Sequence, residues 1–394
     1  MSLSDVLKEF EKIVGKDNVS TSEIDRIVYS FDASEVEGNA KAVIWVEHAW
    51  QVEKILKIAN RKKIPLVLRG GGTSLAGGAV PINSIVVDIS RLNRILEINK
   101  KEKYAVVEPG VLLDDLNYEL KKYNLTFPVL PASHKVVTIS GMISTNAAGI
   151  RAVKYGKTRD WVIEIKVLTG DGKVKTISGK EIDDFCGTEG TVGIIMQAKL
   201  RLTEPIEKTS ISMFKFDEIN PMIEKVIELK DKVIALEFID KLAAEIEGLE
   251  KTNYLFAEFE GEQGDIKDED KIKEIWRIRD GVYPSLAANG FPIIGDPVLP
   301  IEKMGIFLSE LEKMGIPSFG HIGIGIIHPC FRQKDLERKE KVMRLAIELG
   351  GKLNGEHGVG LTKKEFVEKS YISKIRKLKK KYDQNNILNR GKII

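Results

Sequence analysis

Residues 65–80 constrain this chain more than any other segment, because three consecutive glycines interrupt a strand-like apolar run. The run that begins at Pro65 leads into Arg69, Gly70, Gly71, Gly72, Thr73 and Ser74. Glycine tolerates positive φ and lacks the Cβ that would keep a ligand away from the backbone. Successive N–H groups in such a bend converge on an anion, and the two hydroxyl groups add donors, so a diphosphate is the expected ligand.

Two better-known phosphate loops do not fit this segment. It lacks the Gly-Lys-Ser/Thr of a P-loop, and it is not a Gly-x-Gly-x-x-Gly turn that opens a helix. A flexible linker is the remaining alternative. Strand-like runs flank the glycines on both sides, and Ile85–Asp88 resumes the pattern soon afterwards, which favours an ordered loop.

Composition excludes several classes of protein. The 394 residues suffice for two domains, or for one domain with a large insertion, and 61 basic against 58 acidic residues leave a net charge of only +3. This balance argues against nucleic acid as a partner. Cys186 and Cys330 form neither a disulfide framework nor an iron–sulfur ligand cluster. No stretch approaches the roughly 18 apolar residues of a membrane span, and we expect a soluble cytoplasmic protein.

Hydrophobic periodicity predicts mixed helix and strand up to about Pro205. Helices are expected at 4–14, 49–63 and 112–123. Strands are expected at 41–47, 66–68, 85–88, 95–99, 104–108, 162–168, 173–176 and 193–202. Between the strands expected at 162–168 and 173–176, Thr169-Gly170-Asp171-Gly172 predicts a hairpin turn, because Asp-Gly supplies the positive φ values required.

The pattern changes at about Thr209, where strands and helices alternate more regularly. Strands are expected near 210–216, 233–239 and 253–259, and helices near 219–230, 266–280 and 301–314. We interpret this part as a separate α+β module, one sheet with helices on one face. Two further helices, at about 332–349 and 371–382, precede a distinctive tail that contains Asn389.

Small residues gather in two further segments, at 129–156 and 187–193. Small side chains let a flat, bulky ligand approach the backbone, and the Ser, Thr and Asn residues among them supply directional hydrogen bonds. Each segment alone could be an ordinary turn. Together with the glycine loop they favour one large cofactor that lies across the first domain.

Three of the five histidines occur late in the chain, together with an acidic residue. His321 and His328 lie seven residues apart, and Glu356 precedes His357. Two imidazoles and a carboxylate are a common catalytic metal set. An odd spacing places the first two histidines on opposite faces of a regular strand, so a metal site requires a bend at Gly323 or Gly325. The alternative is two unrelated histidines and a helix-capping loop.

Arg279 and His357 are candidates for substrate chemistry. A guanidinium can hold a carboxylate through two hydrogen bonds, although an isolated arginine on a helix is more often a solvated surface residue. In the Glu356-His357 pair the carboxylate can serve as a ligand while the imidazole acts as a general base.

These motifs together resemble a known family. The loop at 69–78, Pro-Ala-Ser at 131–133, Thr-Ile-Ser-Gly at 138–141 and Gly-Thr-Glu-Gly at 187–190 are similar to the FAD-binding domain of the vanillyl-alcohol oxidase/p-cresol methylhydroxylase superfamily. The Gly-His-x-Gly-x-Gly-x-x-His and Gly-Glu-His-Gly segments narrow the resemblance to the D-lactate dehydrogenase/glycolate oxidase D-subunit family. The resemblance covers nearly the whole chain.

The resemblance implies an α+β architecture in three parts. These are a two-subdomain FAD-binding domain (PCMH type) at 1–206, a shortened α+β cap, or substrate, domain at 207–330, and a C-terminal helical segment at 331–394. The last segment is expected to complete the active site and the FAD domain.

The resemblance also implies roles for single residues. FAD would be held by Arg69, Gly70, Gly71, Gly72, Thr73, Ser74, Gly77, Gly78, Pro131, Ala132, Ser133, Thr138, Gly141, Ser144, Asn146, Ala147, Tyr155, Gly156, Glu189, Gly190, Ile194 and Asn389. The metal ligands would be His321, His328 and Glu356, with zinc the first choice and iron or manganese alternatives. His357 would be the base and Arg279 the substrate clamp. Thr73 stands where covalent members carry a histidine, so the FAD is expected to be non-covalent.

The implied activity is oxidation of a small D-2-hydroxy acid, such as D-lactate or glycolate, to the 2-oxo acid. Electrons would pass to an external acceptor, which could be an iron–sulfur subunit, an electron-transfer flavoprotein or a quinone, and a homo-oligomer is possible. The alternatives are a non-catalytic FAD-bearing subunit and an enzyme like alkylglycerone-phosphate synthase. This chain departs from the family at Ile324 and Ile326, where relatives have polar residues, and at Ile293–Gly295, where a lysine is expected.

Overall fold

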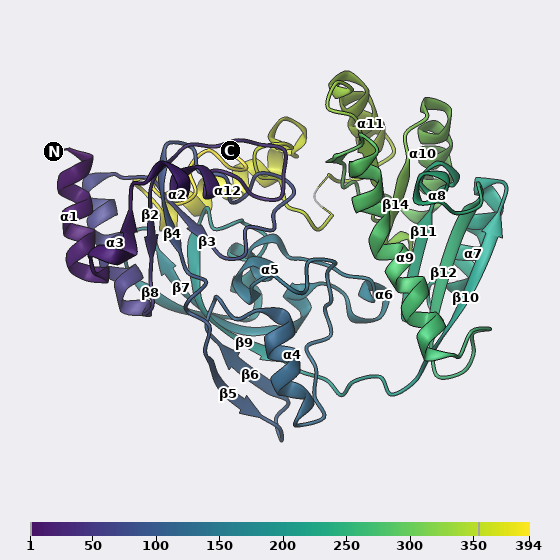
Figure 1. The fold of residues 1–394 in the computed structure, drawn as a ribbon, viewed down its shortest axis with the longest axis horizontal. Helices are drawn as coiled ribbons and strands as arrows, with labels where there is room; N and C mark the ends of the chain where they lie inside the picture. The colour runs from purple at the N-terminus through teal and green to yellow at the C-terminus, as the bar shows by residue number, and fades with distance from the viewer. Residues whose placement is uncertain (1, 354) are drawn as a thin grey trace.

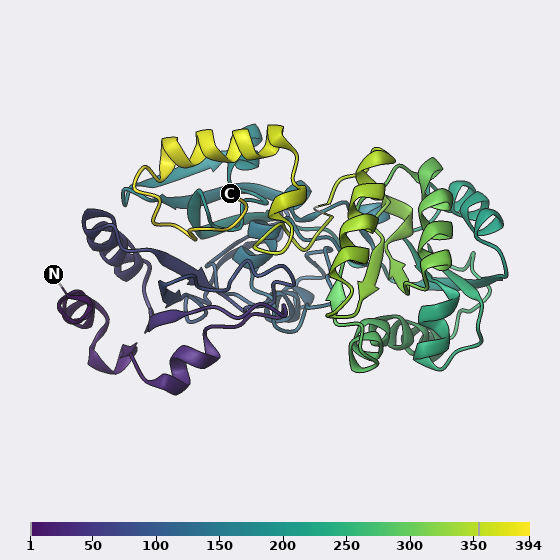
Figure 2. The ribbon, with the colours of Figure 1, turned by 90° about the horizontal axis from the view of Figure 1, so that it is seen from above.

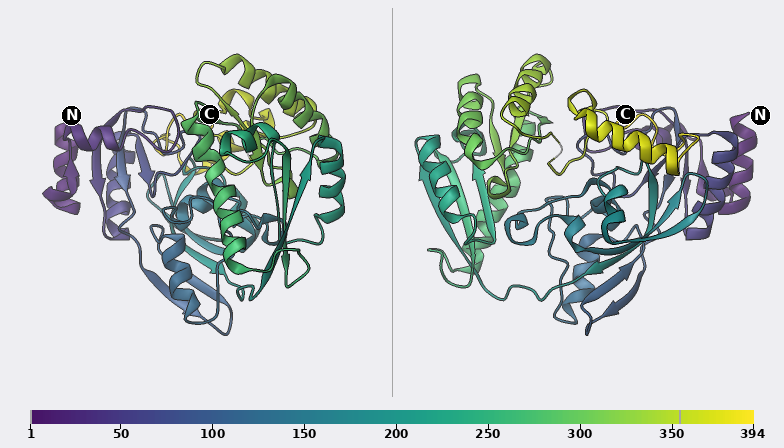
Figure 3. Two further views of the ribbon diagram at one scale, coloured as in Figure 1. Left: turned by 45° about the vertical axis from the view of Figure 1, so that its right-hand side comes forward. Right: turned by 180° about the vertical axis from the view of Figure 1, so that it is seen from behind.

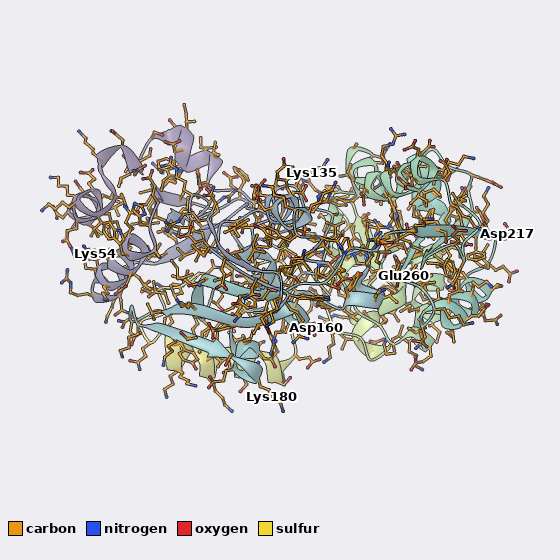
Figure 4. The ribbon with its side chains drawn as sticks, turned by 90° about the horizontal axis from the view of Figure 1, so that it is seen from below. Lys54, Lys135, Asp160, Lys180, Asp217 and Glu260 are labelled. Atoms are coloured by element: carbon orange, nitrogen blue, oxygen red, sulfur yellow. The ribbon has the colours of Figure 1, made fainter. Side chains whose placement is uncertain are left out.

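The computed structural model describes residues 2–353 and 355–394, which form two lobes (Figure 1). The first lobe carries two sheets, and the second is built on a single six-stranded sheet. Figure 4 labels Lys54 at one end of the molecule and Asp217 at the other, with Glu260 near the junction. None of the described helices combines the length and apolar character needed to cross a bilayer.

The first sheet has the order β1-β2-β4-β3, with β4 parallel to both of its neighbours. Its strands are β1 (Val19–Ser20), β2 (Ala40–Trp45), β3 (Leu66–Arg69) and β4 (Ser84–Asp88), and its helices are α1 (Leu3–Val14), α2 (Glu23–Val28) and α3 (Ala49–Lys62). Apolar residues of α1 and α3 pack with those of the sheet in one core. The glycine loop therefore leaves the end of a buried parallel strand.

The second sheet is antiparallel, in the order β5-β6-β9-β7-β8. Its strands are β5 (Ile95–Asn99), β6 (Tyr104–Val107), β7 (Val162–Thr169), β8 (Val174–Ser178) and β9 (Gly193–Arg201). The associated helices are α4 (Leu113–Lys121), α5 (Ile139–Thr145) and α6 (Ala152–Tyr155). The predicted hairpin joins β7 to β8, with φ of +79° at Gly172.

The second lobe, hereafter the cap, has an antiparallel sheet in the order β10-β12-β11-β14-β15-β13. Its strands are β10 (Thr209–Phe216), β11 (Ala235–Ile239), β12 (Asn253–Glu260), β13 (Ile293–Ile294), β14 (Ser318–Gly320) and β15 (His328–Phe331). Its helices are α7 (Ile219–Leu229), α8 (Lys241–Glu247), α9 (Glu269–Ala288), α10 (Ile301–Met314) and α11 (Leu336–Glu348).

The prediction that helices cover only one face of the cap sheet is wrong. Helices α7, α10 and α11 pack against one face, through Leu236 and Leu255, and α8 and α9 pack against the other, through Tyr254 and Phe256. The physical reason is visible in β11, all of whose residues are buried. A strand buried along its whole length is covered on both faces.

The chain returns to the first lobe after the cap. Helix α12 (Lys369–Tyr382) lies along the second sheet, as Figures 2 and 3 show, and its Leu378 and Tyr382 join that sheet's core. The tail then extends the first sheet beside β3, where Leu66 N donates to Ile387 O over 2.8 Å and Asn389 N donates to Leu66 O over 2.9 Å. The expected boundary at 330 falls inside β15, and α11 packs on the cap, so the return begins later than expected.

An ion pair between a partly exposed arginine and a buried carboxylate joins the two lobes. Arg151, at the N-terminus of α6, donates from Nε and Nη2 to the two carboxylate oxygens of Glu258 over 2.8 and 2.7 Å. Glu258 lies on β12 and its side chain is 1% exposed. Val153 of α6 also contacts the cap closely, because a Cβ on Gly323 would lie 2.4 Å from Val153 Cγ2. The lobes therefore meet through α6.

Candidate functional site

A single cavity joins the glycine loop to the late histidines. It is lined by both lobes and by the returning C-terminal segment. The predicted site residues that line it are Gly70, Gly71, Gly72, Thr73, Ser74, Gly78, Pro131, Ala132, Ser133, Thr138, Gly141, Ser144, Ala147, Glu189, Gly190, Ile194, Arg279, His321, His328, Glu356, His357 and Asn389. The structure thus brings together three segments that lie far apart in the sequence.

Five predicted residues do not line the cavity and have other contacts. Arg69 donates to Phe31 O and lies over the Tyr29 ring, and its guanidinium packs against Gly72. Gly77 packs against Leu361, and Asn146 ends α5 and accepts from Arg159 N. The ring of Tyr155 packs edge-on against Trp161, and Gly156 lies against Asp160, which leaves no room for a Cβ.

The glycine loop offers its amides to the cavity. Among the described residues, none accepts a hydrogen bond from the N–H of Gly71, Gly72 or Thr73. A Cβ on Gly71 would lie 2.1 Å from Val136 O, and one on Gly70 would lie 2.4 Å from Thr138 Oγ1. Only glycine fits there, and free amides that face a cavity are the donors that a diphosphate requires.

The tail closes the other side of the cofactor region. Asn389 donates from Nδ2 to Gly78 O and Glu189 O over 2.8 and 2.7 Å, while its Oδ1 is buried without a partner. Glu189 accepts from the amides of Val359 and Gly360 and so fastens the returning segment to the first lobe. An unpartnered amide oxygen in the cavity wall is suited to a ligand donor such as a flavin N–H.

The three histidines surround one carboxylate oxygen. Glu356 Oε1 lies 3.1 Å from His321 Nε2, 3.1 Å from His328 Nε2 and 3.7 Å from His357 Nε2. A 3₁₀ turn at Ile322–Ile324, followed by Gly325 with φ of +85°, supplies the bend that the odd spacing requires. Two imidazoles and a carboxylate converge on one point, which fits a divalent metal ion with nitrogen and oxygen ligands.

The electrostatics of this cluster also fit a cation. Burial alone disfavours a charged His321, but the carboxylates of Glu237 and Glu356 outweigh it and raise the His321 pKa to about 10. His357 differs, because burial outweighs the attraction of Asp296 and Glu356 and lowers its pKa to about 4. The carboxylates around His321 thus attract a cation to this point, and a metal ion bound at His321 Nε2 would take the place of the proton there. Burial keeps the His357 imidazole neutral.

Two buried acids that the sequence did not single out organise the site. Glu237 on β11 is fully buried and contacts His321 Nδ1 over 2.7 Å and Arg279 Nη2 over 2.6 Å. Asp296, also fully buried, accepts from the amides of Glu356 and His357 and from Lys363 Nζ, each over 3.0 Å. A signal existed in β11, where Ala-Leu-Glu-Phe-Ile places one acid in an apolar strand.

Arg279 lies inside the protein. Its side chain is 5% exposed on α9, and its guanidinium lies 4.8 Å from the Phe319 ring. Among the described residues that line the cavity, it is the only lysine or arginine. The solvated alternative for this residue is therefore wrong, and Arg279 offers the cavity a single fixed cation.

The two isoleucines that depart from the family pattern lie away from the cavity wall. Ile326 is fully buried with Ala148 and Ala152 of the first lobe, and Ile324 packs on the same cluster. They belong to the contact between the lobes. Their apolar character is therefore explained by packing against α6 and against Ala148, which precedes that helix.

The fold and this cavity define a two-lobed FAD-binding oxidoreductase, and comparisons with known proteins agree. Residues 40–178 match the family model described as FAD binding domain, and residues 243–393 match FAD linked oxidases, C-terminal domain. The chain is 30% identical to glycolate oxidase subunit GlcD of Bacillus subtilis, over 100% of this chain and 97% of that protein. The chain belongs to this family of FAD-linked oxidases.

Other relatives carry related names. D-lactate dehydrogenase of Archaeoglobus fulgidus is 29% identical over 89% of this chain and 91% of its own. D-2-hydroxyglutarate dehydrogenase of Stutzerimonas stutzeri is 29% identical over 89% of this chain and 90% of its own. Among solved structures, 4-ethylphenol oxidase from Gulosibacter chungangensis superposes with a TM-score of 0.79 at 18% identity, over 99% of this chain and 96% of its own. The last match shows the fold alone.

Proposed function

We propose that this FAD-linked oxidoreductase oxidises a small D-2-hydroxy acid, of the D-lactate or glycolate class, to the 2-oxo acid. The observation that carries the proposal is one cavity with two ends: free loop amides suited to a diphosphate at one, and Arg279 with His357 at the other. FAD, when bound without a covalent link, supplies the hydride acceptor for such an oxidation.

The residues of the cap end have separate roles in this proposal. Arg279 holds the substrate carboxylate. Glu237 keeps the Arg279 guanidinium in place, because Arg279 Nε and Nη2 both contact Glu237 Oε2. His357 Nε2 accepts the proton of the substrate hydroxyl, for which the neutral imidazole is the required form. The names of the relatives, which include D-lactate dehydrogenase and glycolate oxidase subunit GlcD, support this assignment.

The cavity supports a substrate with one carboxylate. Arg279, the only lysine or arginine among the described lining residues, is already shared with Glu237, and the cap side of the wall carries Tyr283, Ile294 and Phe319. A second substrate carboxylate would meet no further lysine or arginine there, and an unpaired buried charge is costly. D-lactate is therefore favoured over a dicarboxylate such as D-2-hydroxyglutarate.

A divalent metal completes the proposal. His321, His328 and Glu356 would hold it, with zinc favoured and iron or manganese as alternatives. A bound divalent ion lowers the pKa of a coordinated hydroxyl group. Elemental analysis of the purified protein tests this part, and a preparation that reduces its flavin at full rate without metal would contradict it.

Electrons must leave the site to an external acceptor. Neither cysteine belongs to an iron–sulfur ligand set, because each stands alone: Cys330 is buried in the cap, and Cys186 packs on the core of the second sheet. We propose an iron–sulfur subunit, an electron-transfer flavoprotein or a quinone as the acceptor, and a homo-oligomer is compatible with this assignment.

Anaerobic titration of the FAD-loaded protein tests the proposed reaction. D-lactate, glycolate and D-2-hydroxybutyrate are expected to bleach the flavin absorbance, whereas L-lactate and D-2-hydroxyglutarate should bleach it much more slowly. If no 2-hydroxy acid bleaches the flavin of metal-loaded protein, the proposal is wrong. A purely FAD-bearing subunit would give that result.

A further inference from the structure

A nitrogen of the proposed base, His357, and a carboxylate oxygen of Asp296 lie close together, and both are buried without a hydrogen-bond partner. Four buried side-chain atoms of the described residues lack a hydrogen-bond partner, and two of them are Asp296 Oδ1 and His357 Nδ1. These two atoms lie 3.7 Å apart. Buried polar atoms are nearly always paired, so each unpaired one calls for an explanation.

The Asp296 carboxylate is held rigidly from its other side. Its Oδ2 accepts hydrogen bonds from the amides of Glu356 and His357 and from Lys363 Nζ, each over 3.0 Å. Gly355 N donates to Asp296 O, and a Cβ on Gly355 would lie 2.4 Å from Asp296 Oδ1. Four contacts therefore position this residue and leave one carboxylate oxygen facing the imidazole.

A competing partner for that oxygen is already engaged elsewhere. His328 Nδ1 lies 3.8 Å from Asp296 Oδ1, but it also lies 3.3 Å from Gly295 O, within hydrogen-bond distance. His357 Nδ1 has no such alternative among the described residues. The open carboxylate oxygen is thus available to His357.

We propose that Asp296 is a positioning residue for His357: its Oδ1 keeps the proton of the neutral imidazole on Nδ1, and the 3.7 Å contact shortens to a hydrogen bond once substrate fills the cavity. A shift of about 1 Å brings the two atoms to hydrogen-bond distance, and catalytic hydrogen bonds are often long before substrate binds. The bond fixes the tautomer in which Nε2 carries no proton. It also steadies the imidazolium that forms when the hydroxyl proton moves to Nε2. This inference rests on the proposed role of His357 as base.

The Asp296→Asn variant tests the bond between Asp296 Oδ1 and His357 Nδ1. Asparagine has the same side-chain shape as aspartate, and its one oxygen can still accept from the amides of Glu356 and His357. Its NH₂ group would face Nδ1 and favour the other tautomer, in which Nε2 carries the proton. We expect the rate of flavin reduction to fall about 10³- to 10⁴-fold, as for comparable Asp–His pairs. The substrate Kd should change by about threefold at most, because Arg279 is intact.

Asp240→Asn is the matched control. Asp240 is only partly exposed, caps α8 and accepts a hydrogen bond from Ser318, and among the described residues it pairs with no histidine. The variant removes a carboxylate from the same lobe, and we expect a reduction rate within about threefold of the unaltered protein. Asp296→Asn with bound FAD and a rate within tenfold of the unaltered protein would overturn the inference. So would a stoichiometric loss of metal in that variant, because Asp296 would then be a ligand; its oxygen lies within 4.8 Å of ligand atoms of His328, Glu356 and His357.

A second measurement needs no variant of Asp296 and no turnover. The chain has only 5 histidines, so nitrogen NMR of histidine-labelled, FAD-loaded protein can resolve them, with His357→Gln for assignment. The proposal expects a proton on Nδ1 and none on Nε2 of His357, and the opposite tautomer overturns it. If no hydroxy acid reduces the flavin but the tautomer is as expected, the proposed function fails while the Asp296–His357 contact stands.

Discussion

Replacement of Gly71 by alanine tests the cofactor loop directly. The added Cβ would lie 2.1 Å from Val136 O, a backbone atom that cannot rotate away. Relief requires the loop to move by about 1 Å, because non-bonded carbon and oxygen atoms rarely approach closer than about 3 Å. A shift of this size removes two or three amide donors from the diphosphate. Hydrogen bonds to a charged group contribute about 1.5–3 kcal/mol each, so FAD affinity should fall by at least about 10²-fold.

The measurement is bound flavin per protein after purification, followed by titration of stripped protein with FAD. Gly179→Ala is the control, because a Cβ on Gly179 would meet nothing within 4 Å, and Gly179 has positive φ, which Gly71 does not. It carries the cost of the strained backbone, about 1 kcal/mol, without the clash. Gly71→Ala protein that retains FAD at full occupancy and unchanged affinity would refute the assignment of these amides to the diphosphate.

Four further variants probe the rest of the cavity and the contact between the lobes. His357→Ala should keep FAD and lose flavin reduction by about 10²- to 10⁴-fold in stopped-flow assays; unchanged reduction would remove it as base. Arg279→Met should raise the Kd of D-lactate by about 10²-fold, and equal Kd would place the carboxylate elsewhere. His328→Ala should lower the metal content, which elemental analysis measures. Arg151→Met leaves Glu258 buried without its partner and should cost about 3 kcal/mol in denaturant unfolding; no change would mean that the pair does not fasten the lobes.

Local structure was largely predictable from the sequence, and particular elements show why. The predicted strand at 95–99 and helix at 301–314 match β5 and α10, because apolar residues recur there with a single clear period. Helix α5 was missed, since its Ile-Ser-Gly-Met-Ile-Ser-Thr sequence is small and polar and resembles a turn. The apolar residues of this helix all lie in the core of the second sheet, and this packing stabilises it.

The candidate site was predicted in part. The four late site residues stood out because histidine is rare in this chain and three histidines cluster there with an acid. The structure places His321, His328 and His357 around one oxygen of Glu356. Glu237 and Asp296 were not predicted as site residues, because a single acid in an apolar segment indicates that something pairs with it but not which residue does. Their importance comes only from the charged groups that face them.

What the amino-acid order alone determined is short in range: the glycine bend, the elements on either side of it, and the presence of metal-type and base-type side chains. Tertiary structure decided which of these groups meet. Glu189 holds the amide of Gly360 across 171 residues, and Glu237 holds Arg279 across 42. Such contacts form only in the folded chain, whose stability is the sum of many weak packing interactions across both lobes. A short sequence pattern does not contain that sum, so it cannot predict which distant residues meet.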